Sequence, residues 1–147
     1  MTYSKKAYSR TRSALKALIQ NSIEGQATCS DYHRDNVLSY IDSWCTVRMT
    51  GPRQSGHTTA MVEVGRKMFK EPIFLFHSCA FAKNCKERFE LERAFSVNQL
   101  NVLRGYSCDA LFVDCSFFLS PAIEEEIRRL AVAFSLKHKT FCLVFVQ

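Results

Sequence analysis

The segment 49–60 reads MTGPRQSGHTTA, and it decides which fold the rest of the chain is expected to build. Gly51 and Gly56 give the spacing G-x-x-x-x-G, which is typical of a phosphate-binding loop between a strand and a helix. Glycine lets the backbone curl so that successive N–H groups point at one anion, and the positive end of the following helix adds to the attraction. The predicted phosphate-binding residues are Gly51, Pro52, Arg53, Gln54, Ser55, Gly56, His57, Thr58 and Thr59.

His57 occupies the position after Gly56 at which this pattern has a lysine. A lysine carries its charge on a long stem, whereas imidazole is shorter and mostly neutral at pH 7. We therefore expect the loop to bind phosphate weakly at neutral pH and more strongly in acid. In an enzyme, the loss of one interaction of this kind with the transition state raises the activation free energy by on the order of 2–4 kcal/mol.

The segment ALFVDC, residues 110–115, is an apolar run that ends in Asp114 and therefore predicts a strand with a carboxylate at its end. In phosphate-loop proteins such an aspartate holds Mg²⁺ together with the Ser or Thr of the loop, which here is Thr58. Thr58 and Asp114 are thus the predicted magnesium ligands. The alternative interpretation is that Asp114 only caps the strand and starts a turn.

From residue 45 onwards, short apolar runs alternate with amphipathic stretches. Alternating strands and helices indicate a parallel sheet covered by helices on both faces. The sequence therefore predicts a three-layer α/β fold with a helical N-terminal extension. Strands are predicted at 45–49, 72–76, 100–103, 110–114 and 140–146, and helices at 3–22, 31–44, 58–68, 79–95 and from 121 onwards.

Three segments resemble the ATPase domain of phage terminase large subunits and related helicase-like ATPases. GPRQSGHTTA is similar to their Walker A segment, in which an R-Q-x-G-K-T string is typical. PIFLFHSCAFAKNCKERF looks like the strand and helix that follow it, and LRGYSCDALFVDCSFFL resembles the stretch that leads into their Walker B segment. The resemblance implies a sheet of P-loop NTPase type, ATP and Mg²⁺ as cofactors, and a viral protein. It covers about residues 31–147 as a truncated P-loop NTPase-like domain, and leaves residues 1–30 as a basic helical extension.

Two departures from that family fall on catalytic positions. His57 replaces the lysine, and Cys115 replaces the glutamate that positions the attacking water. Arg53 matches the arginine that is proposed in the family to stabilise the γ-phosphate, and its charge would partly replace the lysine; a solvated loop arginine is the alternative. If the site is active, Arg53 and Asp114 are the catalytic candidates. We expect the chain not to be an efficient NTPase.

The composition favours an acidic partner and a reducing compartment. The chain of 147 residues has a formal charge of +6, and its first seventeen residues hold five basic and no acidic side chains. The basic segment 3–22 either binds nucleic-acid phosphates or presents a solvated face and docks on protein. Seven scattered cysteines without a C-x-x-C pair indicate free thiols. Without a signal segment or an apolar run of about 18 residues, a cytoplasmic location is expected, in an infected host cell if the protein is viral.

Three functions follow from these observations. The first is a degenerate P-loop protein that binds nucleotide weakly or not at all and acts through protein or nucleic-acid contacts. The second is a slow but genuine ATPase that uses Arg53, Thr58 and Asp114. The third is an inhibitor of a host enzyme. The sequence leaves the partner and the oligomeric state open.

Overall fold

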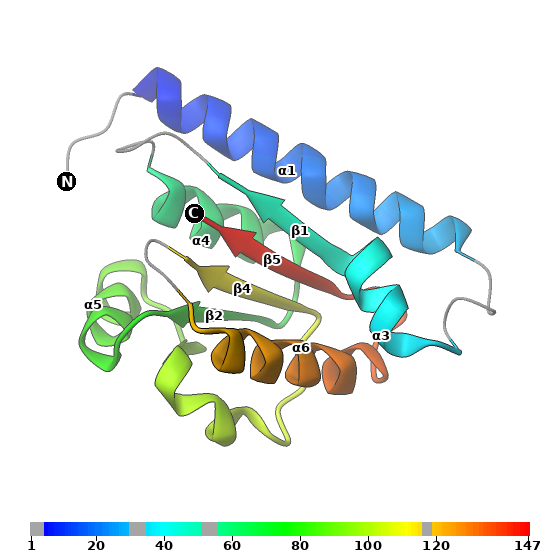
Figure 1. The fold of residues 1–147 in the computed structure, drawn as a ribbon. Coiled ribbons are helices and arrows are strands. Elements are labelled where there is room, and N and C mark those ends of the chain that lie inside the picture. Colours follow the sequence, from blue (N-terminus) through cyan, green and yellow to red (C-terminus); the bar gives the residue numbers. More distant parts are fainter. Residues whose placement is uncertain (1–4, 30–34, 51–55, 116–118) are drawn as a thin grey trace.

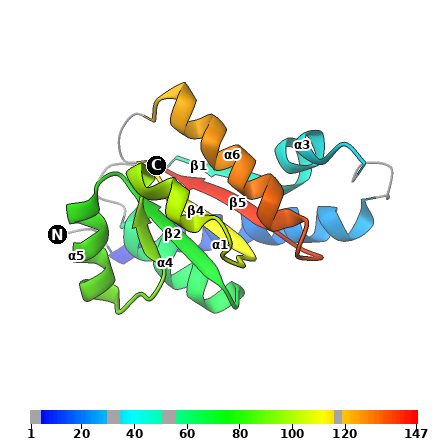
Figure 2. The same cartoon turned by 90° about the horizontal axis from the view of Figure 1, so that it is seen from below.

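A computed structural model of the chain describes residues 5–29, 35–50, 56–115 and 119–147. Within these ranges, five parallel strands form one sheet, and helices cover both of its faces (Figure 1, Figure 2). The order across the sheet is β1-β5-β4-β2-β3. The predicted α/β fold with a parallel sheet is therefore confirmed. The strands are β1 (Thr46–Met49), β2 (Pro72–Phe76), β3 (Ala94–Ser96), β4 (Ala110–Asp114) and β5 (Cys142–Val146).

The central strands are apolar along their whole length because both of their faces are covered. Every residue of β4 and β5 is buried, and the two strands pair from Ala110 with Cys142 to Asp114 with Val146. A parallel sheet with helices on both faces needs such continuous runs, since neither face of the strand meets water. Asp114 is the exception in β4, because its carboxyl side chain is buried together with the apolar ones.

One helix layer consists of α1 (Lys5–Thr28), α4 (His57–Met68) and α5 (Cys79–Phe89), which lie on the same side of the sheet (Figure 2). Helix α4 lies very close to the strands at Gly65. A Cβ atom at this position would come within 2.8 Å of the Phe74 ring and 3.0 Å of the Phe112 ring. Glycine at this position therefore sets how closely α4 approaches the sheet.

Helix α1 is bound tightly to the sheet rather than projecting from it. Leu15 and Ile19 are fully buried. The Gln26 side chain donates to the carbonyl of Phe141 at 2.7 Å and accepts from the Phe141 N–H at 3.1 Å. The helix was predicted to end before Gly25, but it continues to Thr28, and the ring of Trp44 packs against Gly25.

The opposite layer consists of α3 (Val37–Tyr40), a π-helical turn η1 (Ile41–Cys45), a 3₁₀ segment η2 (Val97–Leu103) and α6 (Pro121–Ser135). Helix α6 begins as its sequence predicts, because the Ser120 hydroxyl accepts the N–H of Ile123 at 3.2 Å and Pro121 follows at the first helical position. Ile127, Ala131 and Phe134 are buried on its inner face.

Two element predictions between β2 and β4 are wrong. The segment 100–103 was predicted to be a strand but belongs to η2, and Ala94 and Phe95 of β3 were predicted as the end of a helix. Helix α5 stops early because Glu90 adopts a left-handed conformation, with φ of 55°. Ser96 then starts η2 through a capping box with Gln99. No helix among the described residues is long and apolar enough to cross a membrane.

Candidate functional site

The candidate site lies at the carboxyl ends of the strands, where β1 leads into α4 and β4 ends. Strand β1 ends at Met49 and α4 begins at His57, so the predicted strand-to-helix junction is present. Gly56 precedes the helix with φ of 70°, a left-handed conformation that favours glycine. The predicted phosphate-binding residues Gly51, Pro52, Arg53, Gln54 and Ser55 lie outside the described residues.

The structure brings the two predicted magnesium ligands into direct contact. The Thr58 hydroxyl donates to Oδ2 of Asp114 at 2.7 Å, although the two residues are 56 positions apart in the sequence. His57 lies on the other oxygen of the same carboxylate, with its Nε2 3.5 Å from Oδ1 of Asp114. Thr59 is also buried in the first turn of α4. The first turn of one helix and the end of one strand therefore surround a single carboxylate.

Burial makes this carboxylate unusual. The Asp114 side chain has no exposed surface, and the His57 side chain is 19% exposed. A buried carboxylate is costly unless hydrogen bonds and nearby positive charge compensate it. The hydroxyl of Thr58 supplies one such hydrogen bond. The positive end of α4 supplies a partial charge at the same place, because its first N–H groups have no acceptor within the helix.

The imidazole of His57 is only partly satisfied by this arrangement. Its Nε2 atom is buried and has no hydrogen-bond partner within the described part of the chain. At 3.5 Å the contact with Asp114 is an ion pair only when the imidazole is protonated. Within the described part of the chain, the hydrogen-bonding capacity of Nε2 of His57 is therefore unused.

Cys115 follows Asp114, and its thiol is poorly reactive at neutral pH. Burial, together with the negative charge of Asp114, raises the pKa of its thiol to about 12. At neutral pH the residue is therefore a neutral thiol, which cannot take a proton from water or orient it as a carboxylate does. The thiol therefore cannot perform the water-orienting role that the sequence resemblance would place at this position.

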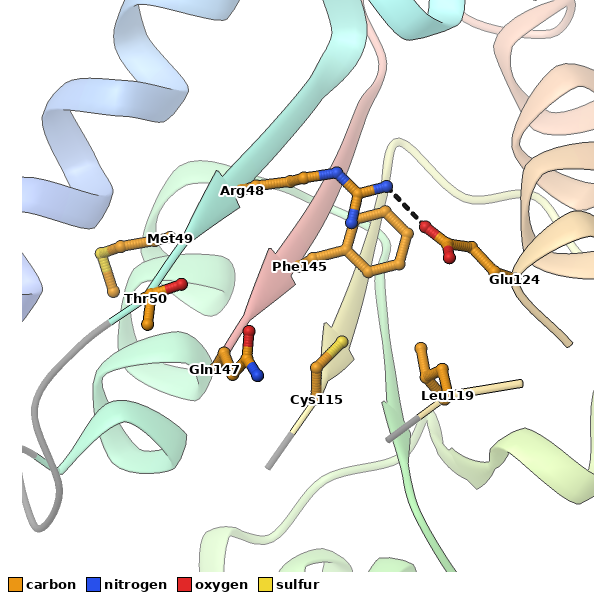
Figure 3. A pocket seen from close by; sticks show the side chains of 8 residues that line it. All are labelled: Arg48, Met49, Thr50, Cys115, Leu119, Glu124, Phe145 and Gln147. Atoms are coloured by element: carbon orange, nitrogen blue, oxygen red, sulfur yellow. Dashed lines mark hydrogen bonds and ion pairs between the residues drawn. The ribbon is translucent and has the colours of Figure 1, made fainter. Parts of the chain in front are cut away.

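A cavity of about 230 Å³ lies beside the end of β4 (Figure 3). The Arg48 guanidinium stacks 4.2 Å from the Phe145 ring centroid and pairs with Glu124 at 2.6 Å. Neither Arg48 nor Glu124 is predicted from the sequence as a site residue. No motif marks either residue, because the pair joins β1 to α6 across 76 positions. Its two charges neutralise each other.

Among the described residues, no cluster of three or more His, Cys, Asp or Glu side chains could hold a metal ion by itself. His77, at the end of β2, stacks against Phe81 with a ring-centroid distance of 4.7 Å.

No known protein family and no curated protein matches the chain. The geometry of His57, Thr58 and Asp114 is therefore what bears on function.

Proposed function

We propose that the chain is a P-loop-type protein whose nucleotide site is weakened, so that it binds Mg-nucleotide with low affinity and acts mainly through contacts with a protein or a nucleic acid. One observation carries the proposal: the Thr58 hydroxyl and the His57 imidazole converge on the buried carboxylate of Asp114. A hydroxyl from a helix start and a carboxylate from the end of a second strand are the two protein ligands that a P-loop site contributes to Mg²⁺.

The donor chemistry of this pair fits magnesium. Mg²⁺ prefers oxygen ligands, and it is usually held through one or two carboxylates together with water and substrate phosphates. Thr58 and Asp114 offer oxygen atoms only 2.7 Å apart, and further ligands would have to come from solvent and nucleotide. When bound, the ion would neutralise phosphate charge. His57, the first residue of α4, is 19% exposed and would contact a phosphate oxygen with its exposed part.

Two features argue for slow turnover. His57 provides a shorter and weaker cation than the lysine of the motif, and Cys115 remains a neutral thiol because its pKa is raised to about 12. Each missing transition-state interaction costs on the order of 2–4 kcal/mol, or roughly a hundredfold to a thousandfold in rate. A slow ATPase is the second candidate, and it is favoured by the intact contact between Thr58 and Asp114.

The experiment is a thermal melt with and without millimolar Mg-ATP. For the wild type we expect a small rise in Tm, equivalent to about 1 kcal/mol or less at millimolar Kd. His57→Lys should bind at least tenfold more tightly, which adds about 1 kcal/mol of stabilisation or more at millimolar Mg-ATP. Asp114→Asn should abolish the response. Asp109→Asn is the matched control, because Asp109 lies at the other edge of the sheet and should leave the response unchanged.

Phosphate release separates the two candidates. A rate above background that disappears in Asp114→Asn identifies a slow ATPase, and a background rate combined with a Tm response identifies binding without turnover. If neither the wild type nor His57→Lys responds to Mg-ATP, the proposal fails and the junction serves only the architecture.

A further inference from the structure

The two helix layers differ strongly in charge. The layer of α1, α4 and α5 contains ten Lys and Arg residues against three Glu, which gives a net charge of +7. The layer of α3, η1, η2 and α6 contains two Arg against four acidic residues, which gives −2. The basic residues of the first layer are Lys5, Lys6, Arg10, Arg12, Lys16, Arg66, Lys67, Lys83, Lys86 and Arg88, all of them exposed.

Five of these residues lie where the three helices adjoin one another. Arg12, Lys16 and Lys67 line one groove of about 210 Å³ between α1 and α4. Arg66 is next to Lys67, and its guanidinium donates to the carbonyl of Phe89 at the end of α5, at 2.6 Å. Arg88 then lies 4.9 Å from the Phe89 ring centroid. We call Arg12, Lys16, Arg66, Lys67 and Arg88 the basic band.

The charge of the basic band is largely uncompensated. Arg12 forms an ion pair with Glu63 at 3.8 Å, and Glu63 also accepts a hydrogen bond from Tyr8. Lys16, Arg66, Lys67 and Arg88 form no ion pair among the residues that the structure describes. Among the described residues, Glu63 lines the groove beside Arg12, Lys16 and Lys67, and Glu90 and Glu92 line a pocket with Arg66. An anion that binds here therefore competes with these carboxylates and otherwise displaces water and counterions.

We propose that the basic band binds the sugar-phosphate backbone of a nucleic acid. A row of exposed Lys and Arg side chains on a rigid surface suits a polymer with one phosphate at each regular step. Helix α1 has 24 residues and so is about 36 Å long, about one turn of a duplex. Phosphate contacts of this kind fix position and carry no base sequence, so the binding is non-specific.

An anionic membrane is the less suitable partner. A helix that binds a membrane surface inserts its apolar face between the lipids. The apolar residues Leu15 and Ile19 of α1 are fully buried against the sheet, so that the helix cannot offer them to a bilayer without leaving the core. The partly exposed Leu18 alone, at 39%, does not replace such a face.

The basic band is separate from the candidate nucleotide site. Arg66 and Lys67 lie in the last turn of α4, whereas His57 and Thr58 lie in its first turn. Nine residues of helix correspond to a distance of about 13 Å along the axis. The inference therefore does not depend on nucleotide binding, and its test is carried out without nucleotide.

The test measures the fluorescence anisotropy of a labelled 30-base-pair duplex with the full chain at 50 and 200 mM KCl. If three to five phosphates are neutralised, the wild-type affinity falls about 40-fold to 500-fold between these salt concentrations. The double variant Lys16→Glu/Lys67→Glu should bind at least tenfold more weakly at 50 mM KCl. Its plot of log K against log salt concentration should be less steep, with a slope smaller in magnitude by about 2. The control Arg104→Glu/Arg129→Glu changes the net charge equally outside the basic band, at exposed sites, and should stay within about threefold of the wild type.

Circular dichroism establishes that each variant is folded. If Lys16→Glu/Lys67→Glu does not fold, Lys16→Gln/Lys67→Gln replaces it, with the same expected loss of slope. Three results overturn the proposal: no salt-dependent duplex binding by the wild type, equal weakening in the band and control variants, or binding to phosphatidylserine vesicles without binding to the duplex. The second result would mean that net charge alone attracts the duplex.

Discussion

The two ends of the parallel strands carry the same three kinds of side chain in different surroundings. We call the side of the sheet where the strands begin its amino edge, and the side where they end its carboxyl edge. At the carboxyl edge, His57 and Thr58 meet Asp114, whose side chain is 0% exposed. At the amino edge, His138 and Ser107 meet Glu71, whose side chain is 46% exposed. Each cluster thus contains an imidazole, a hydroxyl and a carboxylate.

The amino-edge cluster joins loops to one another. The Ser107 hydroxyl donates to Glu71 at 2.9 Å and lies 3.0 Å from Nε2 of His138. Nearby, the carboxylate of Asp109 accepts the backbone N–H groups of Lys70 and Glu71 at 2.9 and 3.0 Å. The protein itself supplies these partners, and solvent reaches the Glu71 carboxylate. The cluster therefore needs no ligand to complete it.

At the carboxyl edge, part of the hydrogen-bonding capacity of the cluster is not used by the described residues. Nε2 of His57 is buried and has no hydrogen-bond partner there. Residue types alone would rank the two clusters equally, so burial and the start of α4 are what favour the carboxyl edge as the functional one. Three predictions test this distinction.

The largest effect is expected from removing the hydroxyl at the buried edge. Thr58→Val keeps the shape of the side chain but deletes the 2.7 Å hydrogen bond to Asp114. Hydrogen bonds to charged groups contribute about 1.5–3 kcal/mol, and the carboxylate here has no access to water as a replacement. We expect the unfolding free energy in urea to fall by about 2–3 kcal/mol. Thr59→Val, in the same turn of α4, is the control and should cost less than about 1 kcal/mol.

A smaller effect is expected from the same deletion at the exposed edge. Ser107→Ala removes the hydroxyl that links Glu71 and His138, but water can take its place because the Glu71 side chain is 46% exposed. The unfolding free energy should fall by less than about 1 kcal/mol. Equal losses for Ser107→Ala and Thr58→Val in parallel urea titrations would show that burial does not distinguish the two clusters.

The smallest effect concerns thiol chemistry. Burial and the charge of Asp114 raise the pKa of Cys115 to about 12, so its alkylation at pH 8 should be at least tenfold slower than that of the exposed Cys79. Asp114→Asn removes the negative charge, which lowers the pKa of Cys115 and should increase its labelling rate severalfold. Cys108 is the control, because burial is the main cause of its raised pKa and Asp114 is not among the causes. Mass spectrometry after timed exposure to iodoacetamide measures all three rates. An unchanged rate at Cys115 would argue against a charged Asp114 beside it.

Where local signals agreed with each other, the sequence predicted the fold well. The apolar runs at 72–76 and 110–114 are strands, and Ser120 and Pro121 start a helix as their residue types favour. Residues 94–95 and 100–103 were predicted wrongly, because the strand at 94–96 forms by pairing with β2 and the apolar residues after it pack as a 3₁₀ turn. Neither event leaves a periodic signal in so short a segment.

The sequence by itself determined the alternation of strands and helices and the strand-to-helix junction at Gly56, because these depend on local patterns. The roles of Thr58 and Asp114 as magnesium ligands stay a prediction. Only the tertiary structure decided that Asp114 is fully buried, that His57 shares its carboxylate, and that the basic residues of three helices form one band. Burial and charge clustering arise from segments that are distant in the chain. No local pattern of residues records how such segments come together.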